Sequence, residues 1–462
     1  MAKKIHIFRK ILKNGVEIKL KNKNYKVTYP TSVWEKLPKS LRKIFADSLS
    51  YITTWHLPLL NDSNTVYHFT HPPIEPVFFK ILLYSIPTNI FEYENINTTS
   101  LIKTFYNSYF QTEYKGLHYP YSGKKTKKSL KEKAILLFSF GKDSLLTYGL
   151  LDELGIAIVP IFIKEPQLVY ENAHKRKLAQ KFYQKFLKEV PFFPLKTGKL
   201  RQEKDFYWGW DIILSQYAFV LIPYYFYHQA KYLFFGNEQS CNFFLKDPEG
   251  YFINPVFEQS VPAMQFLQDI PKLFFINTHI GSLVEPIHEI FITYILHHRY
   301  PELGKFQMSC FSDETESKKK RWCGRCEKCA RMYIFLKALG IPPANVGFYN
   351  NDMLSQKKEN LYVIFDQGRG LSTYAGSGLG KNEQLLAFFL AYKNKVKGEL
   401  IDKFKKMYLH QVEAKKEKLI KEFFGIHSSY SSPTSLRRKT LRIFSEEQQS
   451  ALNYLKPLLS SS

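Results

Sequence analysis

The stretch that most constrains how this chain can fold is residues 134–155, AILLFSFGKDSLLTYGLLDELG. Its first five residues, 134–138, are apolar, as in a buried strand, and they lead into a polar turn at 139–144. Apolar residues then recur with helical spacing up to Gly155. A second apolar run, 156–163, predicts another strand, so the segment is expected to form a βαβ unit of a parallel sheet.

The turn has the composition of an anion-binding loop. Gly141 lets the backbone approach a ligand closely, and the N–H groups at a helix N-terminus attract phosphate. Ser139 and Ser144 add hydroxyl donors, and Lys142 adds positive charge. The structural alternative is an ordinary strand-to-helix turn capped by Asp143 or Ser144. The Walker pattern is excluded, because it needs a further glycine upstream of Gly-Lys-Ser/Thr.

Ser-x-Gly-Lys-Asp-Ser after a strand resembles the PP-loop of the N-type ATP pyrophosphatases, which cleave ATP between its α and β phosphates. The resemblance implies an α/β fold of the adenine-nucleotide α-hydrolase (HUP) type, with helices flanking a parallel sheet. It also implies that ATP and Mg²⁺ bind to the loop, made of Ser139, Phe140, Gly141, Lys142, Asp143 and Ser144. Lys142 would stabilise charge on the phosphates, and Asp143 would hold the magnesium or cap the helix. Phe140 departs from the family, which has a small residue there.

Four of the five cysteines have the spacing of metal ligands. Cys310, Cys323, Cys326 and Cys329 form C-x12-C-x2-C-x2-C, whereas Cys241 lies apart. Four thiolates around one ion are typical of structural zinc. An iron–sulfur cluster and unligated thiols in a reducing compartment are the alternatives, and disulfides are the least expected because no secretory signal begins the chain. We therefore predict a Zn²⁺ site that stabilises the fold and takes no part in catalysis.

Together the two motifs are similar to 7-cyano-7-deazaguanine synthase-like proteins, in which a four-cysteine zinc site follows the ATP domain. The ATP-dependent UDP-N-acetylmuramoyl-L-alanyl-L-glutamate epimerases are similar as well, because they have a long N-terminal region and a Gly-Asn-Glu-x-Ser segment. In this chain that segment supplies Gly236, Asn237, Glu238 and Ser240. The resemblance covers about residues 134–340. It implies that this segment contacts the substrate, a small-molecule carboxylate such as a deazapurine or a nucleotide-sugar peptide, which the enzyme adenylates with release of AMP and pyrophosphate.

Composition sets wider limits on the function. The chain has 462 residues, of which 45% are hydrophobic and 16% aromatic, enough for two or three folded domains. No window is apolar enough to span a membrane, so a cytoplasmic location is expected. The net charge of +25 favours polyanionic ligands such as ATP or RNA, although charge spread over solvated surfaces explains it equally well.

Three functions are therefore considered. The first is the carboxylate-adenylating enzyme, acting as a ligase or an epimerase. The second is a PP-loop RNA-modifying enzyme that carries out thiolation or ligation. The positive net charge supports this function, and the assignment of four cysteines to a metal argues against it. The third is a non-catalytic nucleotide-binding module of a defence system, which Phe140 leaves open.

The patterns also predict an order of regions along the chain. They are an N-terminal α+β domain (1–121), a basic linker (122–133), a PP-loop ATP-binding domain (134–305), a four-cysteine zinc element (306–340), a mostly helical region (341–425) and a flexible tail with a short helix (426–462). We expect one core helix at 211–230 and a flexible glycine-rich loop at 366–380. Glu285 and His288 have the i, i+3 spacing of one helix face, near the substrate cavity, where a structural pair is the commoner explanation.

Overall fold

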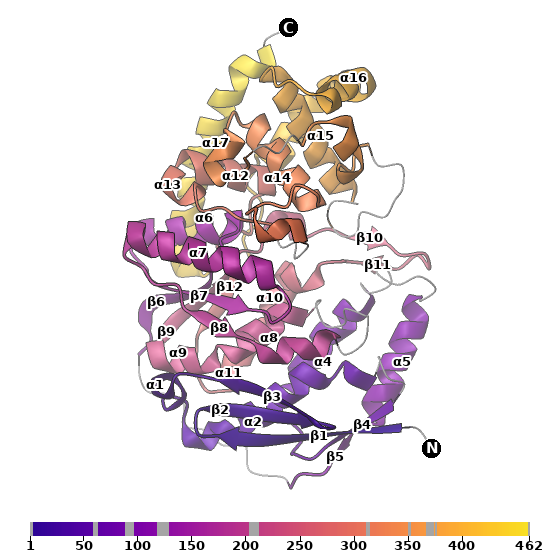
Figure 1. Cartoon of the computed structure of the whole chain (residues 1–462), viewed down its shortest axis with the longest axis vertical. Helices are drawn as coiled ribbons and strands as arrows, with labels where there is room; N and C mark the ends of the chain where they lie inside the picture. Colours follow the sequence, from indigo (N-terminus) through magenta and orange to yellow (C-terminus); the bar gives the residue numbers. More distant parts are fainter. Residues whose placement is uncertain are drawn as a thin grey trace.

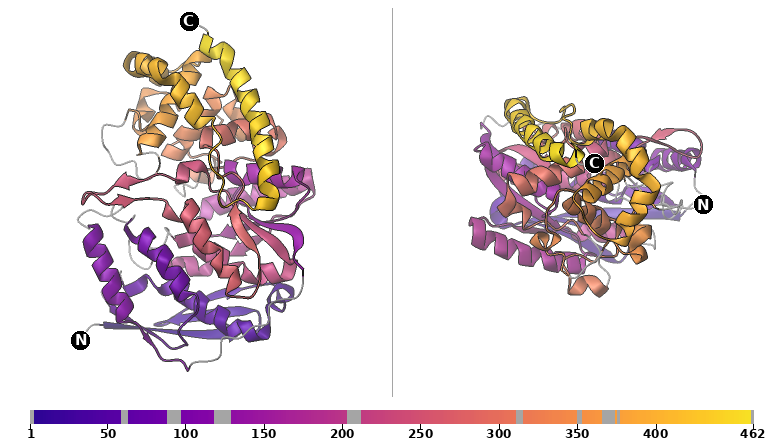
Figure 2. Two further views of the ribbon diagram at one scale, coloured as in Figure 1. Left: turned by 180° about the vertical axis from the view of Figure 1, so that it is seen from behind. Right: turned by 90° about the horizontal axis from the view of Figure 1, so that it is seen from above.

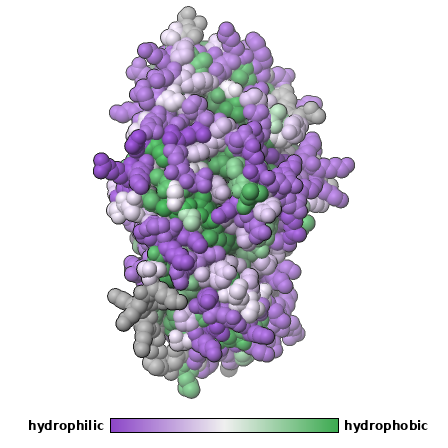
Figure 3. Space-filling model, turned by 90° about the vertical axis from the view of Figure 1, so that its left-hand side faces the viewer, coloured by the Kyte–Doolittle hydropathy of each residue, from purple (hydrophilic) through white to green (hydrophobic). Residues whose placement is uncertain are grey.

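The structure, a computed structural model, is layered along its long axis (Figure 1). It describes residues 3–58, 63–87, 97–117, 129–202, 212–310, 315–349, 353–365, 374 and 377–460. An N-terminal sheet lies at one end, a parallel sheet lies in the middle, and helices from the second half of the chain form the other end. None of the helices within these described ranges is long and apolar enough to cross a membrane. Polar side chains cover most of the face in Figure 3, with apolar patches near its middle.

The middle layer is a sheet of five parallel strands in the order β12-β9-β6-β7-β8. Its strands are β6 (Lys131–Leu137), β7 (Ala157–Lys164), β8 (Phe192–Pro194), β9 (Ala230–Phe235) and β12 (His279–Ser282). The helices that connect them are α6 (Lys142–Glu153), α7 (Val169–Phe186), α8 (Ile213–Val220), α9 (Ile222–His228), α10 (Val261–Leu267) and α11 (Asp269–Lys272). The predicted βαβ unit is confirmed as β6, α6 and β7. β6 begins inside the predicted linker, whose residues 122–128 lie outside the described part.

Both faces of this sheet are buried, which explains the continuous apolar runs. Side chains alternate between faces along each strand. On β6, Ile135 faces the N-terminal layer, whereas Ala134 and Leu136 face the helices on the other side.

The N-terminal sheet has the order β3-β2-β1-β4-β5. Its strands are β1 (Lys3–Leu12), β2 (Gly15–Leu20), β3 (Lys23–Thr28), β4 (Ser63–Tyr67) and β5 (Glu113–Tyr114), and its helices are α1 (Thr31–Trp34), α2 (Lys39–Thr54), α4 (Glu75–Ser85) and α5 (Thr98–Phe110). This region shares a core with the parallel sheet. Phe45 stacks on Phe219 with ring centroids 5.1 Å apart, and the Tyr29 hydroxyl donates to the Val220 carbonyl at 2.8 Å.

The expected core helix at 211–230 is two helices. α8 ends at Val220 and α9 begins at Ile222, one residue before Pro223. Proline has no N–H to donate to the preceding turn, so α8 does not continue through it, whereas proline is accepted in the first turn of a new helix. Position 211 itself lies outside the described residues.

The remaining helices are α12 (Glu289–His298), α13 (Pro301–Gly304), α14 (Glu327–Ala338), α15 (Gly378–Lys393), α16 (Glu399–Phe423) and α17 (Thr434–Ser460). A hairpin of β10 (Leu245–Lys246) and β11 (Phe252–Ile253) projects beside them. The short 3₁₀ helices are η2 (Lys196–Gln202), η4 (Gln239–Cys241), η5 (Phe257–Gln259), η6 (Thr315–Lys318), η7 (Pro343–Val346) and η8 (Gln356–Leu361).

The C-terminal segment differs from the flexible tail and short helix expected at 426–462. α17 has 27 residues and runs from the top of the molecule down to the parallel sheet (Figure 2). The serine-rich segment before it covers the open edge of β12, where Ser431 is buried and its hydroxyl accepts from the Ser282 N–H at 3.1 Å. Gly281 makes this approach feasible, because a Cβ there would lie 2.0 Å from the Ser431 carbonyl oxygen. Serine composition alone suggested a linker, but here it covers an edge strand.

Candidate functional site

The candidate site lies where the connections of the parallel sheet diverge. The chain leaves β6 toward β7 on one side and leaves β9 toward β12 on the other, so β6 and β9 flank the switch point. In open parallel sheets, ligands bind in the crevice outside the carboxyl ends of such strands. The predicted loop 139–144 follows β6, and Gly236 follows β9. A cavity of about 440 Å³ opens there, lined by residues from both segments.

The loop contributes Ser139, Gly141, Lys142 and Asp143 to the wall of this cavity. Gly141 is the N-cap of α6, so neither Asp143 nor Ser144 is the capping residue that the structural alternative required. Ser139 faces the cavity, and its hydroxyl accepts from the Gly141 N–H at 3.3 Å. The buried Ser144 hydroxyl donates to the Gly141 carbonyl at 3.1 Å.

Phe140 occupies the loop without entering the cavity. Its φ of 58° lies in the left-handed region, which costs a non-glycine residue about 1–2 kcal/mol. The ring is fully buried against Phe138 and Phe182, with centroid distances of 4.7 and 5.9 Å. The Phe140 carbonyl accepts from the Met308 N–H at 2.7 Å. The Phe140 side chain therefore serves packing and does not line the cavity.

Gly236 brings the end of β9 against the first turn of α6. A Cβ at this position would lie 2.6 Å from the Asp143 Cβ and 3.2 Å from the Ser144 nitrogen. A glycine is needed here because of this close approach. Asn237 and Glu238 follow it, both buried, and the side-chain nitrogen of Asn237 has no hydrogen-bond partner among the residues that the structure describes.

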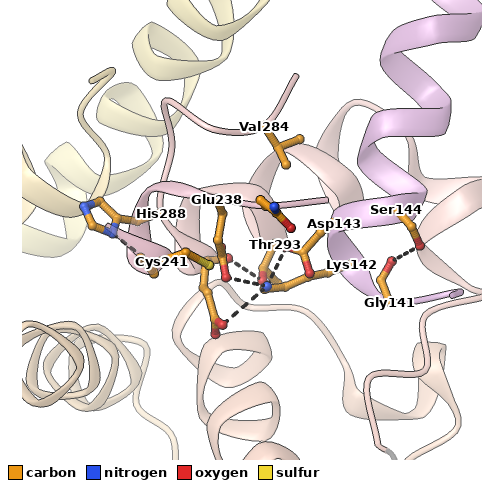
Figure 4. Close-up of polar contacts among 12 residues, drawn as sticks. Gly141, Lys142, Asp143, Ser144, Glu238, Cys241, Val284, His288 and Thr293 are labelled. Carbon is orange, nitrogen blue, oxygen red and sulfur yellow. Dashed lines mark hydrogen bonds and ion pairs between the residues drawn. The ribbon is translucent and has the colours of Figure 1, made fainter. Parts of the chain in front are cut away.

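Lys142 is the centre of a buried charge cluster (Figure 4). Its Nζ lies 2.6 Å from Asp143 Oδ1, 3.3 Å from Glu238 Oε1 and 3.5 Å from Glu289 Oε1. Glu289 also pairs with Arg331, with Nε and Oε2 2.9 Å apart. Glu289 and Arg331 come from the first turns of α12 and α14, so residues from four distant segments meet here.

Contacts among the residues of this cluster determine which of them are charged. Burial disfavours the Lys142 cation, but the three carboxylates outweigh it and raise its pKa above the ordinary value. Burial and the neighbouring Glu289 raise the pKa of Glu238, against the influence of Lys142. Burial also acts on Glu289, but Arg331 and Lys142 outweigh it and lower its pKa. Lys142 and Glu289 are thus charged, and Glu238 holds a proton more readily.

The cavity walls carry nearly balanced charge. They include the cations Lys142, Lys175, Lys328 and Arg331 and the acids Asp143, Glu171, Glu238, Glu289 and Glu327. A bare triphosphate would meet five acidic groups against four cations. A polyphosphate accompanied by a divalent cation fits this lining better, because the metal offsets the carboxylates.

Lys175 is a site residue that the sequence analysis missed. It is buried, and its ammonium group donates to the carbonyls of Ser139 and Met308, so it ties the loop to the segment before Cys310. Burial lowers the pKa of Lys175 to about 8, although Glu171 partly opposes this. A signal was present in the sequence, because Lys175 shares an apolar helix face with Leu178 and Phe182.

Tyr374 closes another side of the cavity. It lies within the glycine-rich segment predicted as a flexible loop, most of which is outside the described residues, while its end forms the start of α15. The Tyr374 hydroxyl donates to Glu383 Oε2 at 2.6 Å, and the Arg331 guanidinium lies 5.8 Å from its ring centroid. Burial and Glu289 raise the pKa of Glu383 to about 7.

A second cavity of about 270 Å³ adjoins the first along the carboxyl edge of the sheet. Ser139, Asp143 and Gly236 line both cavities. The second one is more apolar, with walls from the ends of β6, β7 and β9, and Asn237 lies in it.

The four spaced cysteines form one cluster. Their sulfur atoms lie within 4.8 Å of one another, and those of Cys323 and Cys329 are 3.6 Å apart. Metal–sulfur bonds of about 2.3 Å in a tetrahedron place sulfurs about 3.8 Å apart, so the cluster fits a four-thiolate metal site. Cys326 is the N-cap of α14, which carries Arg331 into the cavity wall. Cys241 lies outside the cluster and lines the cavity.

The predicted pairing of Glu285 with His288 on one helix face is wrong. Both precede α12, with Pro286 between them, and His288 is the N-cap residue. Glu285 accepts instead from the backbone N–H groups of Tyr430 and Ser431 at 2.5 and 2.8 Å. The Nδ1 of His288 lies 3.0 Å from the hydroxyl of Ser240, which lines the cavity.

No family model, curated protein or solved structure matches this chain. The geometry itself thus defines the class of site: a glycine-containing loop before a helix, at the switch point of a five-stranded parallel sheet, next to a four-cysteine cluster.

Proposed function

We propose that the protein is an ATP-dependent enzyme that adenylates a substrate carboxylate and releases AMP and pyrophosphate. The observation that carries this proposal is the position of the loop 139–144, of which Ser139, Gly141, Lys142 and Asp143 line a cavity at the switch point between β6 and β9. We assign a structural Zn²⁺ ion to the four cysteines, because their spacing and their distances suit it.

The two adjoining cavities suggest how ATP and substrate divide the space. The loop, with Ser139, Ser144 and Lys142, would hold the polyphosphate. Asp143 would hold Mg²⁺, which supplies charge neutralisation when bound. The more apolar second cavity suits the nucleoside, and the unpartnered Asn237 amide offers it a donor. The larger cavity, with Arg331 and Lys175 in its wall, is left for the carboxylate substrate.

In the reaction, a carboxylate oxygen of the substrate forms a bond to the α phosphorus, and the bond from that phosphorus to the pyrophosphate oxygen breaks. Lys142 neutralises charge on the departing phosphates, and Arg331 orients the carboxylate. Positioning and charge neutralisation provide most of the catalysis. The product is an acyl adenylate, which a 7-cyano-7-deazaguanine synthase-like enzyme would pass to a nitrogen acceptor and a muramoyl-peptide epimerase-like enzyme would use to acidify an α-carbon.

Incubation with MgATP and a library of carboxylates, followed by nucleotide chromatography, tests the proposal. We expect AMP and pyrophosphate with at least one carboxylate. ADP as the sole product would refute the assignment, because attack would then fall on the γ phosphorus. Absence of any turnover together with tight ATP binding would favour a non-catalytic module instead.

One observation favours RNA modification as a second candidate. A surface cavity of about 870 Å³ is lined by Lys23, Lys164, Lys196 and Lys199, and none of the described residues in its wall is acidic. Against thiolation, burial and the nearby Glu238 raise the pKa of the Cys241 thiol, which is the one cysteine outside the cluster. Co-purification of RNA with a steep dependence on salt concentration would support this candidate.

A further inference from the structure

A chain of hydrogen bonds runs from the cavity to the surface through His288. Its Nδ1 lies 3.0 Å from Ser240 Oγ, and its Nε2 lies 3.2 Å from Glu422 Oε1. The three residues come from η4, the N-cap of α12 and the last turn of α16. Figure 4 shows His288 pointing toward the segment that carries Cys241, next to Ser240.

Burial changes steeply along this chain. Ser240 lines the cavity and is 2% exposed, His288 is completely buried, and the Glu422 side chain is 42% exposed. A proton that leaves the cavity through Ser240 and His288 would thus reach solvent beside Glu422.

The hydrogen bonds define the tautomer of the imidazole. A carboxylate only accepts, so the proton of the neutral ring lies on Nε2 and points to Glu422. Nδ1 is then an acceptor for the Ser240 hydroxyl. Burial lowers the pKa of His288, Glu422 partly raises it, His427 lowers it and Glu289 raises it. The ring is therefore neutral near pH 7 and able to take up a proton.

We propose that Ser240, His288 and Glu422 form the base that deprotonates the acceptor in the second half of the reaction. This inference rests on the proposed function. A nucleophile bearing an N–H or O–H, such as ammonia, an amine or water, forms a bond to the acyl carbon, and the bond from that carbon to the AMP oxygen breaks with its electron pair going to AMP. The proton of the nucleophile passes to Ser240 Oγ while the Ser240 proton passes to His288 Nδ1.

The resulting imidazolium is stabilised by Glu422 and gives up one proton to solvent after AMP has left. Hydroxyl, imidazole and carboxylate in sequence are the arrangement by which a base is oriented and its cation stabilised. Base assistance of this kind accelerates a reaction about 10²–10⁴-fold. A purely structural role, in which the three residues only join α12 to α16, predicts that their substitution lowers both half-reactions equally.

The test separates the two half-reactions, using a carboxylate found in the library screen. We expect His288→Gln to retain ATP–pyrophosphate exchange and to retain hydroxamate formation with hydroxylamine, a nucleophile that needs no base. Steady-state AMP release with an ammonium salt as acceptor should fall about 10²-fold or more. Ser240→Ala is the second variant, in case the first does not fold. His427→Gln is the matched control, because its ring lies 4.9 Å from that of His288 and its Nε2 bonds the backbone carbonyl of Glu422 at 3.0 Å, so it takes no part in the two side-chain hydrogen bonds of His288.

Equal losses in exchange and in AMP release would refute the base and leave a structural role. An unchanged AMP release would refute it as well. Histidine ¹⁵N spectra of the wild-type protein provide a readout that needs no substrate, and we expect the Nε2–H tautomer for the signal that His288→Gln removes. The opposite tautomer, or a second bound zinc that His427→Gln releases, would overturn the inference, since His288, Glu422 and His427 would then be metal ligands. If no carboxylate supports ATP–pyrophosphate exchange, the proposed function is refuted. The ¹⁵N spectra then still test the chain of hydrogen bonds through His288.

Discussion

Replacing Gly236 with alanine should disable the loop while leaving the rest of the fold in place. The new Cβ would lie 2.6 Å from the Asp143 Cβ, whereas carbon atoms in contact are about 3.5–4.0 Å apart. The end of β9 and the first turn of α6 must therefore separate by about 1 Å. A misplacement of that size costs about 10²-fold in rate, and overpacking a buried site costs about 1–3 kcal/mol of unfolding free energy.

We therefore expect pyrophosphate release to fall about 10²-fold in Gly236→Ala, together with a weaker MgATP-induced rise in melting temperature. The matched control is Gly378→Ala, because, apart from its own helix backbone and chain neighbours, no described atom lies within 4 Å of a Cβ there. The control should keep wild-type turnover and stability. If Gly236→Ala keeps wild-type turnover, or if both variants lose it equally, close approach of β9 to the loop is not what positions Asp143.

Three further predictions concern the loop, the cysteines and one buried acid. Asp143→Ala and Ser139→Ala should each abolish pyrophosphate release without lowering the melting temperature much, whereas Asp152→Ala, at the exposed far end of α6, should retain it. Elemental analysis should find about one zinc per chain, and Cys323→Ser should lose the metal and melt at a lower temperature; an iron-containing protein would contradict the assignment. The pKa of Glu383 is raised to about 7, so the folded protein binds more protons than the unfolded chain between about pH 4.5 and 7, and stability falls as pH rises through this window, by up to about 3 kcal/mol. Chemical denaturation at pH 5 and pH 8 should show this fall in the wild type and much less of it in Glu383→Gln.

What could be predicted from the sequence depended on local patterns. The loop, its flanking strands and α6 are contiguous, so apolar spacing and turn composition were enough to place them. The cysteines were recognised by their spacing, because three of the four lie close together along the chain. Gly236 and Glu238 were found through resemblance, and the close approach that requires the glycine became visible only with Asp143 beside it.

The residues that sequence analysis missed are those brought in from far along the chain. Lys175 lies 36 residues from Ser139, and Glu289, which pairs with Lys142, comes after the last strand of the parallel sheet along the chain. Nothing in the local sequence of Tyr374 distinguishes a cavity wall from a loop. Helical periodicity was also misleading at Glu285 and His288, because the chain makes a turn at 285–286 before α12 begins and the two side chains have different partners.

The difference between contiguous and distant residues also explains why the first half of the proposed reaction could be proposed from the sequence and the second could not. Phosphate binding uses backbone N–H groups of one contiguous loop, so it can be predicted from consecutive residues. A base for the second step needs a hydroxyl, an imidazole and a carboxylate in line. Here Ser240 and His288 are 48 residues apart, and His288 and Glu422 are 134 apart. Packing of α16 against the start of α12 brings His288 and Glu422 together, so a C-terminal helix that no motif marked supplies the carboxylate of the proposed base.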